Sequence, residues 1–143
     1  MIYVVLKEPA GHEPHEEVVF ASTSKTVAEH KCQELTAIEH ELYKLTNLIR
    51  QDVSAIIDTW PILTPPDVKS LPERKLVWHD CAWRNPYYLE YEEAWRKQSS
   101  DMRQLTQDTI AKYADIHNVS QQSLRDLYGS FQASYSIKEV ESD

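Results

Sequence analysis

The densest group of side chains that could do chemistry lies near the N-terminus, in the segment GHEPHEE. It places two histidines beside three glutamates: His12, Glu13, His15, Glu16 and Glu17. Imidazole and carboxylate groups can bind Zn²⁺, but a zinc site needs three or four ligands held at fixed geometry. A loop interrupted by Pro14 does not hold them so. The sequence therefore favours a solvated polar loop, and it predicts neither a metal nor a cofactor.

A second candidate is the run His79, Asp80 and Cys81, which contains a thiol and a base. In a strand His79 and Cys81 would share one face while Asp80 points to the other. No glycine-rich turn follows Cys81 to supply an oxyanion site. The two glycines stand 118 residues apart and cannot form a phosphate-binding loop. We therefore expect a buried, unreactive Cys81 and a protein that is not an enzyme.

Aromatic side chains are concentrated between residues 78 and 95, which hold six of the fourteen in the chain. Trp and Tyr are favoured interface anchors because they bury much area for little lost side-chain freedom. Packing beneath a helix accounts for Trp78, Tyr91 and Trp95. Adjacent helical residues cannot face the same way, so at least one of two neighbouring tyrosines should be exposed. The residues predicted to bind a partner are Trp83, Tyr87, Tyr88, Glu90, Glu92 and Glu93.

Residues 110–127 follow the pattern of a helix, a tight turn and a second helix. Asn118 tolerates the left-handed conformation that ends a helix, Ser120 can cap the next one, and Leu124 and Leu127 give that helix a buried face. On these residues the segment resembles the helix-turn-helix of DNA-binding regulators, with Asn118 where glycine is commonest. Gln and Arg are suitable readers of base edges. The resemblance would present to a DNA groove Gln121, Gln122, Ser123 and Arg125.

The charge of the chain argues against this DNA role. Fifteen Lys and Arg against 23 Asp and Glu give a net charge of −8 with His neutral. DNA affinity depends on clustered Lys and Arg, whereas the second helix carries only Arg125, next to Asp126. An acidic surface suits a basic protein partner instead, including one that binds nucleic acid. The charge also has a simpler interpretation, because it keeps a protein soluble.

Local patterns predict the elements that position these residues. The chain is expected to be a single domain, residues 1–143, of the α+β class. A small antiparallel sheet of about three strands would pack on two long helices, with a short C-terminal helix. The predicted segments, in order, are a strand pair at 1–21, a long helix at 24–59, a Pro-rich loop at 60–74, a strand at 75–83, helices at 86–128 and a frayed tail at 131–143.

The first long helix predicts self-association. Its apolar residues repeat every seven positions, with Ala28, Leu35, Leu42, Ile49 and Ile56 in one row. A stripe of this length is more than a small sheet can cover, so part of it needs another helix. We therefore expect a homo-oligomer formed through residues 28–56.

Two cysteines without metal or disulfide spacing suit a reducing cytosol, and the first residues lack the pattern of a signal peptide. We therefore expect a cytoplasmic protein, and the leading hypothesis is a non-enzymatic protein–protein interaction module. The opening strand pair and helix resemble those of small uncharacterised phage and bacterial proteins. Size, acidity and this resemblance suggest a phage-type accessory or anti-defence inhibitor that acts on a nucleic-acid-handling host complex. The alternatives are a helix-turn-helix transcriptional regulator and a structural subunit of a larger particle.

Overall fold

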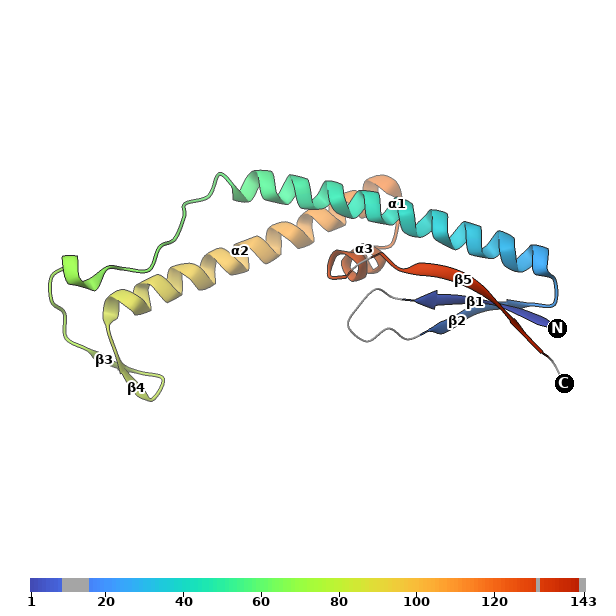
Figure 1. Cartoon of the computed structure of the whole chain (residues 1–143). Helices are drawn as coiled ribbons and strands as arrows, with labels where there is room; N and C mark the ends of the chain where they lie inside the picture. Colours follow the sequence, from blue (N-terminus) through green and yellow to red (C-terminus); the bar gives the residue numbers. More distant parts are fainter. Residues whose placement is uncertain (9–15, 131, 142–143) are drawn as a thin grey trace. The chain divides into compact units, whose positions relative to one another are not determined.

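The computed structural model of the chain describes residues 1–8, 16–130 and 132–141 (Figure 1). In these residues the protein has the predicted α+β class. The elements are β1 (Ile2–Glu8), β2 (Glu17–Ser22), α1 (Lys25–Ile57), the 3₁₀ turn η1 (Val68–Ser70), β3 (Val77–His79), β4 (Ala82–Arg84), α2 (Pro86–His117), α3 (Gln121–Tyr128) and β5 (Ser134–Val140). They form two compact units, unit 1 (residues 1–51 and 110–143) and unit 2 (residues 52–109). The single domain expected from the sequence stays a prediction.

Unit 1 contains a three-stranded antiparallel sheet in the order β2-β1-β5. Its central strand carries the β-branched run that predicted it, and Val5 is fully buried opposite Phe20 on one side and Ile137 on the other. The prediction that residues 75–83 form the third strand of this sheet was wrong, because β5 occupies that position in the sheet. The frayed tail predicted at 131–143 was wrong for the same reason. Tyr135 and Ile137 alternate with exposed residues, so β5 has one apolar face, and it pairs along β1 from Ile2 to Glu8.

Helix α1 matches its predicted range of 24–59 closely and begins where Ser24 Oγ accepts a hydrogen bond from the Val27 amide at 3.3 Å. Two long-range hydrogen bonds hold α1 within unit 1. Arg50 Nη2 donates to the Tyr128 carbonyl at 2.8 Å, and Glu39 Oε1 accepts from the Ala133 amide at 2.9 Å. The core of this unit gathers side chains from β1, α1, the end of α2, and α3: Val5, Ala28, Ile49, Ile110, Ala114, Leu124 and Leu127.

Unit 2 is built from the end of α1, the Pro-rich segment, a two-stranded hairpin and most of α2. The single strand predicted at 75–83 is wrong, since β3 and β4 are joined by a turn at Asp80 and Cys81. Helix α2 starts as predicted, with the Asn85 Oδ1 accepting from the Tyr87 amide at 3.0 Å. Val53 is the only buried side chain among residues 52–109, all of which the structure describes.

Candidate functional site

The β3–β4 hairpin exposes two tryptophans side by side. Trp78 and Trp83 are directly opposed across the two strands, so their side chains share one face. Their rings meet edge to face, with centroids 5.5 Å apart and planes at 70°. Nevertheless 61% of Trp78 and 65% of Trp83 remain exposed. The expectation that Trp78 packs in the core was wrong, because no helix of unit 2 covers this face of the hairpin.

The turn between the two strands is tight and has an unusual sequence. Asp80 and Cys81 both have positive φ, at 49° and 61°, the conformation of a two-residue type I′ hairpin turn. Such turns usually contain Asn or Gly, and that missing sequence signal explains why the hairpin was predicted as one strand. The turn also places Cys81 at the tip, where it is exposed. The prediction of a buried Cys81 was therefore wrong.

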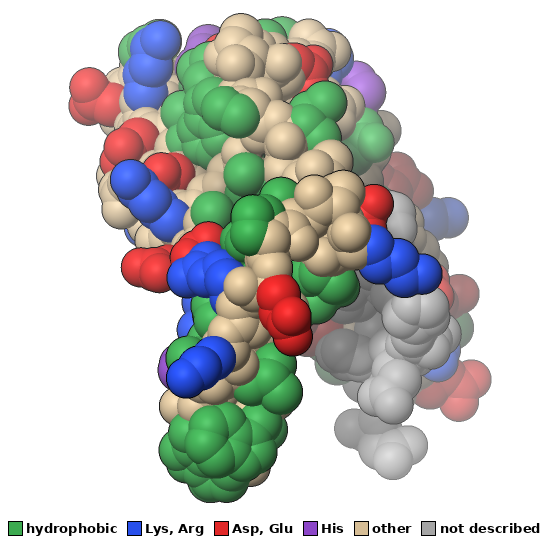
Figure 2. Space-filling model, turned by 90° about the vertical axis from the view of Figure 1, so that its left-hand side faces the viewer, with side chains coloured by type: hydrophobic (Ala, Val, Ile, Leu, Met, Phe, Trp, Pro, Cys, Tyr) green, Lys and Arg blue, Asp and Glu red, His purple; other side chains and the backbone are tan. Residues whose placement is uncertain are grey.

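Hydrophobic side chains continue beside the tryptophans. Leu76, two residues before Trp78, is 55% exposed, and we call Leu76, Trp78 and Trp83 the hairpin surface. Val77 is 40% exposed on the opposite side of the strand. Figure 2 shows hydrophobic side chains gathered over the end of the molecule that carries β3 and β4. A soluble protein gains by keeping such side chains out of water, so a contiguous exposed group indicates a contact surface.

Polar contacts attach the segment before the hairpin to the first turns of α2. Tyr87 Oη donates to the Pro72 carbonyl at 2.9 Å, and Arg74 Nη1 contacts Glu90 Oε1 at 2.7 Å. The Arg74 guanidinium also lies over the Tyr87 ring, 4.7 Å from its centroid. Its hydrogen bond to Glu90 raises the pKa of Arg74 above its already high ordinary value. Tyr87 and Glu90 therefore hold the loop, and their binding to a partner stays a prediction.

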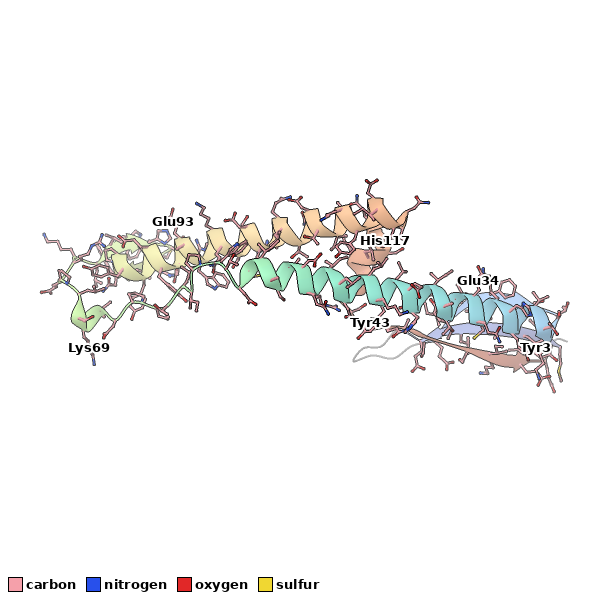
Figure 3. The ribbon with its side chains drawn as sticks, turned by 90° about the horizontal axis from the view of Figure 1, so that it is seen from above. Tyr3, Glu34, Tyr43, Lys69, Glu93 and His117 are labelled. Atoms are coloured by element: carbon pink, nitrogen blue, oxygen red, sulfur yellow. The ribbon has the colours of Figure 1, made fainter. Side chains whose placement is uncertain are left out.

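The remaining predicted partner residues on α2, Tyr88, Glu92 and Glu93, differ in their surroundings. Tyr88 is 42% exposed, which confirms that at least one of the two adjacent tyrosines faces solvent. Glu92 lies beside two cations, with its carboxylate 3.9 Å from Arg84 and 4.0 Å from Arg96. Glu93 projects from α2 into solvent, as does Lys69 from η1 (Figure 3). The exposed charges of this unit thus have both signs.

Sequence reasoning missed part of the exposed apolar surface of unit 2. Trp95 was expected in the core, but 54% of its surface is exposed. Met102, seven residues further along α2, is 39% exposed. Ile62 is 90% exposed beside Trp60 and Pro61, which line a groove of about 420 Å³ together with Tyr91 and Trp95. A helical apolar stripe indicates which residues share a face, but not whether a second element covers that face.

The helix-turn-helix-like segment has the predicted local geometry. Asn118 has φ 51°, and Ser120 Oγ accepts a hydrogen bond from the Ser123 amide at 3.3 Å as the N-cap of α3. Leu124 and Leu127 are buried, which confirms the predicted core face of this helix. On the opposite face the proposed base readers pair within the helix. Gln121 Oε1 accepts from Arg125 Nη2 at 3.0 Å, and Gln122 Nε2 donates to Asp126 Oδ1 at 2.7 Å.

Part of the candidate metal-binding segment lies outside the described residues, whereas the candidate thiol group lies within them. His12, Glu13 and His15 lie outside the described residues, while Glu16 and Glu17 are exposed. Within residues 1–8, 16–130 and 132–141 no three His, Cys, Asp or Glu side chains form a group that could hold a metal ion. His79 Nδ1 lies 3.3 Å from Asp80 Oδ2 at the hairpin tip, where both side chains are exposed.

Over the same described ranges, no helix combines the length and apolar composition needed to cross a lipid bilayer. Comparison of the chain with protein-family models, with curated proteins and with solved structures finds no match.

Proposed function

We propose that this protein is a non-enzymatic protein–protein interaction module that binds its partner through the hairpin surface. The observation that carries the proposal is the Trp78–Trp83 pair, two adjoining tryptophans that are each more than 60% exposed. Tryptophan is the residue most enriched among interface side chains whose removal costs 2 kcal/mol or more. The partner site that fits is an apolar pocket wide enough to take two indole rings.

The local structure makes the hairpin surface suitable for binding. The two-residue turn and the indole–indole contact restrain both tryptophans before any partner arrives. The contacts of Tyr87 and Arg74 also hold the preceding loop. Side chains that are already ordered lose less conformational entropy on association, which would otherwise cost about 0.5–1.5 kcal/mol for each one.

The charge of the chain supports a basic partner. The net charge is −8, and Glu90, Glu92 and Glu93 lie on the first turns of α2, after the hairpin. Charges around an interface mainly speed association and select against like-charged partners. A nucleic-acid-binding protein has such a basic surface, and a small acidic protein could compete there with nucleic acid. Our specific proposal is therefore a phage-type accessory or anti-defence inhibitor that acts on a host nucleic-acid-handling complex.

Affinity capture with the full-length chain tests the hairpin surface. We expect wild-type protein to retain a partner and Trp83→Ala to lose it. The substitution should lower the affinity for the partner roughly 30-fold or more, which corresponds to an anchor residue worth about 2 kcal/mol. The matched control is Ile62→Ala, which changes the most exposed apolar side chain of the unit outside the hairpin surface. Equal retention by wild type and Trp83→Ala, or loss with both variants, would contradict the proposal. Addition of nucleic acid should release the partner if the specific proposal holds.

A second candidate function is DNA binding through α3, favoured by the turn at Asn118 and the cap at Ser120. Gln121, Gln122 and Arg125 are exposed, and base contact would require breaking their pairing within the helix. Arg125 is the only base on α3, so contacts to phosphate would be few. A gel shift at low salt is decisive. A regulator should bind duplex DNA at micromolar protein and lose binding with Arg125→Ala, while absence of binding to any duplex excludes it.

A further inference from the structure

A row of exposed apolar side chains runs along α2, separate from the hairpin surface. Tyr88, Trp95 and Met102 follow one another at intervals of seven residues and are 42%, 54% and 39% exposed. At 3.6 residues per turn, residues seven apart lie almost on one line along a helix. We call these three residues the α2 seam.

The neighbouring face of α2 has a cover of its own, whereas the seam is covered only in part. Gln98 Nε2 donates to the Pro61 carbonyl at 2.8 Å, which holds residues 60–63 beside Tyr91 and Gln98. Trp95 lies at the border of that groove with more than half of its surface still in water. An apolar row that is only partly covered is a surface against which a second helix can pack.

We propose that a second copy of the chain covers the α2 seam, with the two α2 helices packed antiparallel around a two-fold axis near Gln98 and Ser99. In this register Trp95 of each copy contacts Met102 of the other. Sulfur–aromatic contacts of this kind are favourable. Two-fold symmetry makes every such contact twice. The small side chains of Ser99 and Thr106 on the same face allow the helices to approach.

Charge complementarity selects the antiparallel arrangement. At 1.5 Å per residue, Glu92 of one copy comes within about 3 Å, along the axis, of Arg103 in the other, and both lie on the same flank of the seam. Arg103 is exposed and forms no ion pair within the described residues. In a parallel pair Glu92 would instead lie level with Glu92 of the other copy, and about 16 Å along the axis from its Arg103. Like charges side by side oppose association.

The second copy fits α2 better than the surface predicted on α1. In the heptad row of residues 28–56, Ala28 and Ile49 are already buried within unit 1, whereas every member of the α2 seam is exposed. The exposed parts of the three seam residues amount to roughly 300 Å² per copy, taking 150–250 Å² for an aromatic side chain. Stable interfaces bury about 800 Å² per partner. The α2 seam supplies less area than this, so we expect a weak dimer that forms only at high protein concentration.

Sedimentation of the full-length chain tests the proposal. Wild-type protein should form a dimer at tens of micromolar, and Trp95→Glu should be monomeric there. Trp83→Glu, which changes an equally exposed tryptophan on the hairpin surface, should dimerise as wild type. Glu92→Arg and Arg103→Glu should each weaken the dimer about tenfold, and the double variant should restore it. A monomeric wild type, a dimer unaffected by Trp95→Glu, or no restoration would each overturn the proposal.

Cross-linking distinguishes the two orientations. In a chain with Cys32→Ser and Cys81→Ser, the antiparallel register brings Ser99→Cys to within about 2 Å of its counterpart along the axis, but leaves Thr106→Cys about 22 Å away. A short bismaleimide should therefore link the first variant and not the second. Linking of both variants indicates a parallel pair, and linking of neither indicates that the α2 seam is not the contact; each result overturns the proposal. These readouts do not involve the partner of the hairpin surface, so either proposal can fail alone.

Discussion

Units 1 and 2 differ in where their large hydrophobic side chains lie. Among its described residues unit 1 buries ten hydrophobic side chains, among them Val5, Ile49 and Leu124, while unit 2, which is described throughout, buries Val53 alone. Unit 2 also exposes three of the four tryptophans by more than half. Apolar area left in water costs about 25 cal/mol per Å² relative to burial. The difference indicates that unit 1 supplies the stable framework, and it supports our proposal that unit 2 carries the contact surfaces.

The largest effect should come from cutting the core of unit 1. Leu124→Ala empties a side-chain site that is fully buried, so we expect the free energy of unfolding to fall by about 2–5 kcal/mol. Ile62→Ala removes a side chain that is 90% exposed and should change it by less than about 0.5 kcal/mol. Urea denaturation followed by circular dichroism measures both values. If the two variants lost similar amounts of unfolding free energy, the proposed difference in stability between the units would be contradicted.

Helix caps offer a smaller test of the same contrast. Ser120→Ala removes the N-cap of α3 beside the buried Leu124, and should lower the free energy of unfolding by about 0.5–2 kcal/mol. Asn85→Ala removes the cap of α2 in unit 2, where the first helical turn is not anchored by a core. We expect this variant to speed hydrogen exchange in that turn without changing the urea midpoint. A lowered midpoint with Asn85→Ala would show that unit 2 contributes to global stability.

The turns should respond differently to glycine. Cys81 has φ 61° in the hairpin turn of unit 2, and Asn118 has φ 51° in unit 1. Left-handed backbone costs most L residues about 1–2 kcal/mol, whereas Asn tolerates it. Cys81→Gly should therefore strengthen the hairpin by up to about 1 kcal/mol, and Asn118→Gly should be nearly neutral. Hydrogen exchange of the β3 and β4 amides measures the first, and a weakened hairpin would count against the assigned turn.

The smallest expected effect depends on pH and lies in unit 1. Burial, followed by the charges of Glu39 and Glu17, raises the pKa of Tyr135 above its ordinary value of 10.0. The folded state therefore holds this proton more tightly, and the resulting stability is complete below pH 10 and is lost as the pH rises through the folded-state pKa. Tyr135→Phe should flatten the fall of unfolding free energy above pH 10. Tyr128→Phe is the control, and identical pH profiles would contradict the assignment.

Much of the fold was readable from local sequence signals. The strand pair at the N-terminus, the start of α1, the start of α2 and the turn at Asn118 all lie where predicted. Each of these features depends on residues that are close in sequence, so it could be predicted from a single sequence. The hairpin and β5 were missed because a turn without Gly and a strand near the terminus give weak local signals.

The candidate site was predicted only in part, and the errors have a common cause. Trp83 and Tyr88 are exposed as expected, but Trp78 and Trp95 were assigned to a core that unit 2 does not have. The contacts of Tyr87 and Glu90 with Pro72 and Arg74 were not predicted, and the binding of these two residues to a partner stays untested. Whether an aromatic side chain is buried depends on elements distant in sequence, and periodicity carries no information about them.

The sequence by itself determined which segments form helices, where several of them begin, and that aromatic residues gather between positions 78 and 95. These properties follow from backbone preferences and side-chain spacing within a few residues. The tertiary structure alone decided that β5 completes the sheet, that Cys81 is exposed at the hairpin turn, and that three tryptophans remain in water. Burial is a property of the whole packed chain, since each side chain is covered or left exposed by residues far from it in sequence.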